Sequence, residues 1–235
     1  MIPNTSALDA IVLAGGMGTR LREVVADKPK VLADVAGRPF LTRLLDQLAA
    51  AGVASVVLST GYMAEMIEAK IGTQYRGLPV RYSRENEPLG TGGALRLALD
   101  KTRSDPLLAL NGDSFCDANI LELRAFHREK HARATLLLTS VQDTSRFGSV
   151  ETDANGAVTR FEEKGRAGGP GWINAGVYCL SREVISSIPV GRAVSMEHEI
   201  FPTLIGVGLC GFHACGAFID IGTPHSYAEA ERFFA

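Results

Sequence analysis

The chain has 235 residues, of which 46% are hydrophobic and 21% charged, and its formal net charge is -2. That length suits one α/β domain, and the composition provides enough apolar residues for a sizeable core. The nearly balanced charge gives no indication of a nucleic-acid or membrane-surface partner, so cations that bind phosphate would have to be gathered locally.

The cysteines and the first residues of the chain both favour a cytoplasmic protein. The four cysteines form no CxxC pair, which favours reduced thiols in the cytosol (Cys116, Cys179, Cys210 and Cys215). The opening segment MIPNTSALDAIVLAGG lacks the basic start and cleavage site of a signal peptide, and its apolar run is too short to span a bilayer. We expect it to form a first strand.

Strand and helix patterns alternate through the first part of the chain, which predicts a mainly parallel sheet with helical crossovers. The expected strands cover residues 9–14, 53–59, 80–84, 106–110 and 134–141. The helices expected between them cover residues 39–51, 63–71, 92–100 and 120–131. Pro39 suits the first helical position, and Thr91 could cap the third of these helices.

The pattern changes beyond residue 141. Short strands at 148–152 and 157–163 flank Asp153-Ala154-Asn155-Gly156, a hairpin-turn signature that predicts a small antiparallel insertion or lid. A strand at 175–180, helices at 182–187 and 196–205, a strand ending at Asp220 and a helix after Thr223-Pro224 complete the prediction. No internal repeat occurs.

A glycine-rich loop, Ala14-Gly-Gly-Met-Gly-Thr-Arg-Leu21, directly follows the first predicted strand. Closely spaced glycines let backbone N–H groups approach phosphate oxygens, and the following Arg20 adds a bidentate charge. The loop fits neither the Rossmann GxGxxG pattern nor a Walker loop. A purely structural turn is the alternative if the loop is considered by itself.

Two further segments strengthen the phosphate-binding interpretation. Lys28-Pro29-Lys30 places two cations where a triphosphate would lie, although lysines are more often solvated surface residues. Pro88-Leu-Gly-Thr-Gly-Gly-Ala-Leu95 is a second glycine cluster at the start of a helix, where a flat base or sugar could approach the backbone. A tight turn without chemical function is the alternative for this second cluster.

Two aspartates follow apolar strands. Asn111-Gly112-Asp113 lies at the carboxyl end of one strand, where open α/β sheets place their ligands, and Asp220 ends another in GAFIDIGTP. Together the two carboxylates could hold one Mg²⁺, which prefers carboxylate and phosphate oxygens. Helix capping or turn formation is the alternative role for each aspartate.

These motifs, together with FEEKG and NAGVY, occur in the order seen in sugar-1-phosphate nucleotidylyltransferases, and the chain resembles that family over nearly its whole length. The resemblance implies the nucleotide-diphospho-sugar transferase fold, a Rossmann-like mixed, mainly parallel sheet flanked by helices. It also implies one nucleotidyltransferase domain over residues 1–235, with an NTP-binding half at about 1–115 and a sugar-phosphate half at about 116–235.

The resemblance also assigns roles to particular residues. Arg20 and Lys30 would be catalytic, Asp113 and Asp220 would ligate Mg²⁺, and Lys28 occupies a less constant position. The nucleotide would be bound by residues of the glycine segments and of the Asn-Gly-Asp turn (Leu13, Ala14, Gly15, Gly16, Gly18, Thr19, Arg20, Gly90, Thr91, Gly92, Asn111 and Gly112). The sugar phosphate would be bound by Glu163, Lys164, Asn174 and Gly176. Val31 and Gly165 stand where the family often has proline, which leaves the lid geometry open.

The implied reaction joins an NTP to a sugar 1-phosphate with release of pyrophosphate. Within the family the likeness favours GTP and D-glycero-α-D-manno-heptose 1-phosphate, for surface polysaccharide synthesis. Mannose 1-phosphate with GTP, and N-acetylmuramate 1-phosphate or another hexose 1-phosphate with UTP, stay open, because residue chemistry alone does not select the base. A non-catalytic NDP-sugar sensor is an alternative of another class, and homo-oligomers are common in the family.

Overall fold

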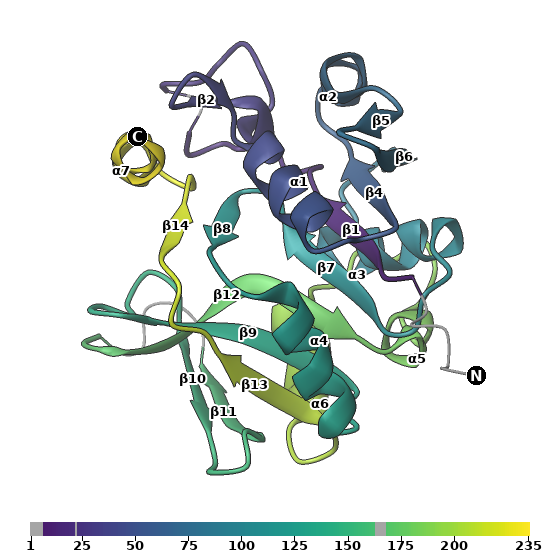
Figure 1. Ribbon diagram of the computed structural model, residues 1–235, viewed down its shortest axis with the longest axis vertical. Coiled ribbons are helices and arrows are strands. Elements are labelled where there is room, and N and C mark those ends of the chain that lie inside the picture. Colours follow the sequence, from purple (N-terminus) through teal and green to yellow (C-terminus); the bar gives the residue numbers. More distant parts are fainter. Residues whose placement is uncertain (1–6, 22, 163–167) are drawn as a thin grey trace.

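The computed structural model describes residues 7–21, 23–162 and 168–235, and its centre is an eight-stranded mixed sheet (Figure 1). The strand order is β13-β9-β12-β7-β1-β4-β6-β5. These strands are β1 (Asp9–Leu13), β4 (Ser55–Thr60), β5 (Gln74–Tyr75), β6 (Leu78–Arg84), β7 (Leu107–Asn111), β9 (Ala134–Val141), β12 (Gly171–Leu180) and β13 (Leu209–His213). The mainly parallel sheet with helical crossovers predicted from the sequence is confirmed.

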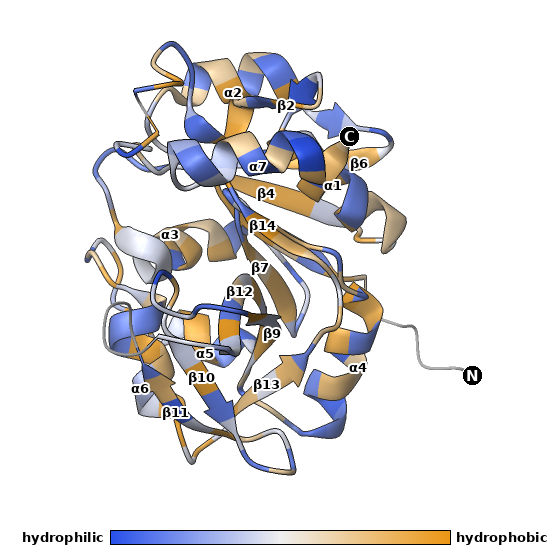
Figure 2. Ribbon diagram, turned by 90° about the vertical axis from the view of Figure 1, so that its left-hand side faces the viewer, coloured by the Kyte–Doolittle hydropathy of each residue, from blue (hydrophilic) through white to orange (hydrophobic). Residues whose placement is uncertain are grey.

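Apolar side chains alternate between the two faces of the sheet and form two cores. In β1, Ala10 and Val12 belong to one core and Ile11 to the other, and all three are fully buried. The first core lies under α1 (Leu41–Ala50), α2 (Ala64–Ile71), α4 (Ile120–Glu129) and α7 (Pro224–Phe234). The second lies under α3 (Gly90–Ala98), α5 (Arg182–Ser186) and α6 (Phe201–Leu204), and Figure 2 shows the apolar strands between the helical layers.

Three two-stranded ribbons accompany the main sheet. The expected insertion is the antiparallel pair β10 (Ser149–Thr152) and β11 (Val158–Glu162). The other ribbons pair β2 (Asp34–Val35) with β3 (Arg38–Pro39) and β8 (Ser114–Cys116) with β14 (Phe218–Asp220). Short 3₁₀ turns at Lys30–Leu32 and Leu99–Lys101 and a π-helical turn at Met196–Ile200 complete the secondary structure.

Several local predictions were wrong. Pro39 ends β3, so α1 begins two residues later, at Leu41. Thr91 lies inside the first turn of α3 and does not cap it, because the helix already begins at Gly90. The helix expected at 196–205 is present, but it begins as a π-helical turn and ends as the short α6. The strand expected to end at Asp220 is β14, and β13 is an additional strand before it.

The thiols of Cys116, Cys179, Cys210 and Cys215 are free, as predicted, and the first three are buried. Among the helices that the structure describes, none is long and apolar enough to cross a membrane.

Candidate active site

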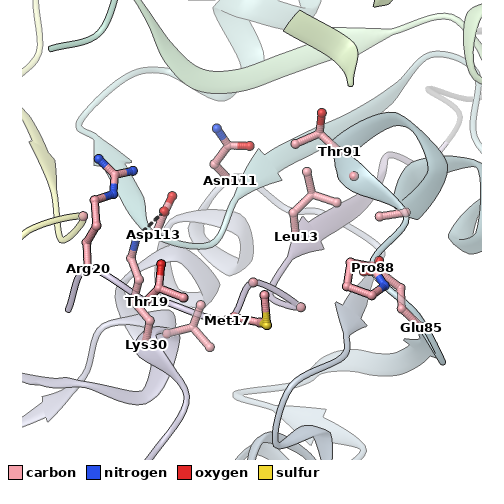
Figure 3. A pocket seen from close by; sticks show the side chains of 17 residues that line it. Leu13, Met17, Thr19, Arg20, Lys30, Glu85, Pro88, Thr91, Asn111 and Asp113 are labelled. Atoms are coloured by element: carbon pink, nitrogen blue, oxygen red, sulfur yellow. Dashed lines mark hydrogen bonds and ion pairs between the residues drawn. The ribbon is translucent and has the colours of Figure 1, made fainter. Parts of the chain in front are cut away.

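A pocket of about 410 Å³ opens where β1 and β7 end at the carboxyl edge of the sheet (Figure 3). Eleven of the predicted site residues line it (Leu13, Gly15, Gly16, Gly18, Thr19, Arg20, Lys30, Gly90, Thr91, Asn111 and Asp113). Arg20, Lys30 and Asp113 lie at one end of the pocket, and Glu85 and Pro88 lie at the other. The structure therefore brings together the glycine segments and the charged residues that the motifs singled out.

The first glycine loop leaves β1 and turns sharply at Gly18, which has φ +58°. A Cβ atom at Gly18 would lie 3.0 Å from Cβ of Lys30, and one at Gly15 would lie 2.7 Å from Oε1 of Glu85. The glycines thus let the loop pass close to both ends of the pocket. Arg20 is exposed, and it forms no ion pair with any residue that the structure describes.

Lys30 begins the 3₁₀ turn that follows Pro29, and its side chain is only 13% exposed. Its Nζ donates to Oδ2 of Asp113 at 2.5 Å. Lys28, in contrast, pairs with Asp34 at 2.9 Å on the surface, and this hydrogen bond raises the pKa of Lys28. Of the two cations expected to face a triphosphate, only Lys30 lines the pocket.

Asp113 and Asp220 are brought together by the ribbon of β8 and β14. Asp220 lies opposite Ser114 in the register of that ribbon, and the N–H of Ile221 donates to the carbonyl of Asp113 at 2.9 Å. Oδ2 of Asp220 accepts the N–H of Gly222, which lines the pocket beside Lys30.

Asp113 and Asp220 suit Mg²⁺, because this ion takes most of its ligands from substrate and water, better than they suit a metal that needs a full set of protein ligands. Two carboxylates are hard oxygen donors, and Mg²⁺ usually takes one or two of these together with substrate phosphates and water. No group of three or more His, Cys, Asp or Glu residues arranged to hold a metal occurs in the described ranges. Each aspartate instead pairs with a cation, Asp113 with Lys30 and Asp220 with Arg146.

The second glycine cluster packs against residues 192–194. A Cβ atom at Gly90 would lie 2.6 Å from the carbonyl oxygen of Val194, and Gly92 donates its N–H to the same oxygen at 2.8 Å. Gly90 and Thr91 line the pocket, whereas Gly92 is buried beneath it. Thr91 is held from both sides, since its hydroxyl donates to Glu197 and accepts the N–H of Met196.

Ala14 and Gly112 also lie beneath the pocket. Gly112 donates its N–H to the carbonyl of Leu13, and a Cβ atom at Gly112 would lie 2.5 Å from that oxygen. Ala14 is buried, with its N–H bonded to the carbonyl of Ser59. The backbone of both residues fixes the ends of β1 and β7 and so positions Asn111 and Asp113.

The predicted sugar-side residues on β12 lie below Asn111. Gly176 has φ +76°, and a Cβ atom there would lie 2.8 Å from Nδ2 of Asn111. Asn174 accepts the N–H of Gly176 and donates to the hydroxyl of Tyr178. Neither residue is among those lining the pocket. Glu163 and Lys164, the other two residues predicted to bind the sugar phosphate, lie outside the described residues.

Glu85 is a lining residue that the sequence analysis missed. Its carboxylate accepts the N–H of Leu89 at 2.9 Å and the hydroxyl of Ser59 at 3.4 Å, and it forms no ion pair within the described part of the chain. Desolvation raises the pKa of Glu85, and the two hydrogen bonds, which lower it, offset only part of this effect. Its place directly after β6 was the available signal, because ligands gather at the carboxyl ends of parallel strands.

Comparison with known proteins places the chain, with this α/β fold and this pocket, in a family. The family described as Nucleotidyl transferase matches residues 9–235, and the chain belongs to it. The chain is 42% identical over 229 residues to a mannose-1-phosphate guanylyltransferase from Mycobacterium tuberculosis, covering 96% of this chain and 64% of that protein. It therefore spans less than two thirds of that relative.

Another relative is similar over almost its whole length. The D-glycero-alpha-D-manno-heptose 1-phosphate guanylyltransferase of Aneurinibacillus thermoaerophilus is 36% identical over 226 residues, which cover 96% of this chain and 97% of that protein. Among solved structures, HddC from Yersinia pseudotuberculosis superposes with a TM-score of 0.85 at 34% identity, over 97% of this chain and all of that one. HddC complexed with GMP-PN superposes with a TM-score of 0.84 at 35% identity, with the same coverage.

Proposed function

We propose that the protein transfers GMP from GTP to D-glycero-α-D-manno-heptose 1-phosphate in the presence of Mg²⁺, giving GDP-heptose and pyrophosphate for surface polysaccharide synthesis. The observation that carries the proposal is one pocket with Glu85 at one end and Lys30, Asp113 and Arg20 at the other. A nucleoside triphosphate has the matching polarity, with donor groups on the base and anionic phosphates.

Glu85 supports guanine as the base. A carboxylate accepts two hydrogen bonds side by side, and guanine offers two adjacent donors, N1–H and the N2 amino group. Uracil has one N–H between two carbonyl oxygens, and adenine and cytosine each place a ring acceptor beside their amino group. A carboxylate therefore favours guanine, provided that Glu85 is ionised. Gly90 and Thr91 also line the pocket.

At the other end, the residues can position and neutralise phosphate. The sugar 1-phosphate oxygen would attack the α-phosphorus in line and displace pyrophosphate. Because this oxygen is already anionic at neutral pH, no general base is required, and catalysis depends on positioning and charge neutralisation. Arg20 and Lys30 would supply fixed positive charge. Asp113 and Asp220 would hold Mg²⁺, which when bound neutralises further phosphate charge.

The acceptor is proposed from the relatives. The heptose 1-phosphate guanylyltransferase is similar over 97% of its length, and a mannose-1-phosphate guanylyltransferase is similar at higher identity over 64% of its length. Both sugars have the manno configuration. Mannose 1-phosphate is accordingly the second candidate acceptor.

The test is pyrophosphate release by the purified protein, with GTP, UTP, ATP and CTP each paired with manno-heptose, mannose, N-acetylmuramate and glucose 1-phosphates. We expect release with GTP and the heptose 1-phosphate, loss of release in EDTA, and loss in Asp113→Asn. Faster turnover with mannose 1-phosphate would replace the acceptor, and faster turnover with UTP would overturn the role of Glu85. If the folded protein released no pyrophosphate with any combination of nucleotide and sugar 1-phosphate, a non-catalytic NDP-sugar sensor would be the explanation.

A further inference from the structure

Arg146 lies outside every motif described above, yet its guanidinium pairs with one of the two aspartates of the proposed metal site. Nη2 of Arg146 lies 3.1 Å from Oδ1 and 3.3 Å from Oδ2 of Asp220. The Asp220 side chain is 17% exposed, whereas that of Arg146 is 43% exposed. The arginine thus approaches the carboxylate from the solvent side.

Local structure holds Arg146 in this position. The N–H groups of Phe147 and Gly148 both donate to the carbonyl of Thr144, which closes a tight turn around the arginine. Phe147 packs edge-on against Phe218 of β14, with ring centroids 5.6 Å apart. The Arg146 guanidinium lies over the Phe147 ring, 4.9 Å from its centroid. The turn is therefore fastened to the same strand that carries Asp220.

The turn is also joined to β12, the strand that carries the predicted sugar-side residues. The N–H of Thr144 donates to the carbonyl of Gly169 at 3.1 Å, just before β12 begins at Gly171. The turn that carries Arg146 is thus joined both to β14, which ends at Asp220, and to the start of β12.

We propose that Arg146 has two alternating partners: it neutralises Asp220 while no metal is bound, and it binds the phosphate of the sugar 1-phosphate once a cation has taken Asp220. This proposal rests on the function proposed above. A guanidinium released from one carboxylate retains five donors, a geometry that matches a phosphate dianion in the same bidentate way. Lys30 is placed in the same manner on Asp113, so each metal carboxylate carries its own counter-ion.

The proposal predicts effects of opposite sign in one variant, Arg146→Gln. Removing the competing cation should tighten Mn²⁺ binding to the substrate-free protein by about three- to fivefold, because partly exposed ion pairs are weak. Removing the phosphate ligand should raise KM for the sugar 1-phosphate by about tenfold or more, and KM for GTP should change less than about twofold. A merely structural role of Arg146 would weaken both interactions together.

Mn²⁺ binding would be measured by electron paramagnetic resonance of the free ion, without substrates, and KM by pyrophosphate release. The matched control is Arg133→Gln, since Arg133 is 40% exposed and pairs with Glu183 at 3.2 Å, next to the opposite end of β9. Circular dichroism would confirm that each variant is folded. Arg146→Lys should restore Mn²⁺ affinity toward that of the wild type.

Unchanged or weaker Mn²⁺ binding in folded Arg146→Gln would overturn the counter-ion role, and an unchanged KM for the sugar 1-phosphate would overturn the phosphate role. Either result overturns the proposal as stated. The metal-binding experiment needs no catalysis, so it separates failure of this proposal from failure of the proposed reaction, which wild-type turnover decides independently.

Discussion

The two ends of the pocket hold charge in opposite ways. At the end proposed to bind phosphate (the phosphate end), Asp113 and Asp220 each pair with a cation, and the exposed Arg20 adds further positive charge. At the end proposed to bind the base (the base end), the Glu85 carboxylate accepts an N–H and a hydroxyl, and desolvation raises its pKa. A carboxylate that is paired with a cation suits a site where a metal ion could replace that cation. A carboxylate without an ion pair can accept hydrogen bonds from a ligand.

The largest effect is expected from removing Lys30, the part-buried cation at the phosphate end. Lys30→Ala should lower kcat by about 10²–10³-fold, the usual loss when a preorganised charge-stabilising group is removed, with the fold retained. The measurement is pyrophosphate release at saturating substrates. Lys28→Ala is the control, because Lys28 pairs with Asp34 on the surface, and its kcat should stay close to that of the wild type. Unchanged turnover in Lys30→Ala would contradict a catalytic role for Lys30.

At the base end, Glu85→Gln should change preference among nucleotides. The amide keeps the shape of the side chain but presents one donor beside one acceptor, so kcat/KM for GTP should fall by about 10–100-fold relative to UTP. Competition between the two nucleotides in one reaction measures the ratio directly. Glu87→Gln, an exposed carboxylate two residues away, is the control. The same GTP-to-UTP ratio in both variants would contradict a base-reading role.

The raised pKa of Glu85 also predicts a pH dependence confined to the base end. As pH falls toward this raised pKa, the carboxyl gains a proton at a higher pH than the ordinary value of 4.5, and GTP binding should weaken. Equilibrium binding of GTP at a series of pH values would show the effect. The side chain of Glu85→Gln cannot titrate, so the affinity of this variant for GTP should change less with pH over the same range. A wild-type profile as flat as that of the variant would argue against the carboxylate.

The smallest effects should come from crowding the glycine loop one end at a time. Gly15→Ala would press a methyl group toward Oε1 of Glu85 and should mainly raise KM for GTP. Gly18→Ala imposes a positive φ on alanine and crowds Cβ of Lys30, so it should mainly lower kcat. Each change should be about tenfold, because a close contact at Gly15 or a positive φ on alanine at position 18 costs about 1–3 kcal/mol. Identical effects of the two substitutions would mean that the loop acts as one unit.

The sequence predicted the parts of the molecule in which neighbouring residues act together. The glycine loop, its Arg20, and the buried strands β1, β4 and β7 follow from local pattern, since parallel central strands are continuously apolar. Most of the residues that line the pocket from these segments are among the predicted site residues, with Met17 of the loop as an exception.

Long-range packing accounts for what local pattern did not reveal. Glu85 follows an alternating strand and carries no motif that distinguishes it from Glu87. Arg146 was not singled out because its partner, Asp220, is 74 residues away. Thr91 looked like a helix cap, but its hydroxyl is engaged by Glu197, 106 residues further along the chain. Asn174 and Gly176 were placed on the sugar side by resemblance, and their direct contact with substrate stays a prediction.

The ribbon of β8 and β14 has a consequence for the order in which the parts of the protein fold during synthesis. Residues 107–116 are synthesised long before residues 218–220, yet Asp113 acquires its partner segment only when that late strand docks beside β8. Long-range pairings of this kind form late, because loop closure must precede them. A nascent chain would therefore complete most of its central sheet before Asp113 and Asp220 come together, so the proposed metal site would form only with the final strand.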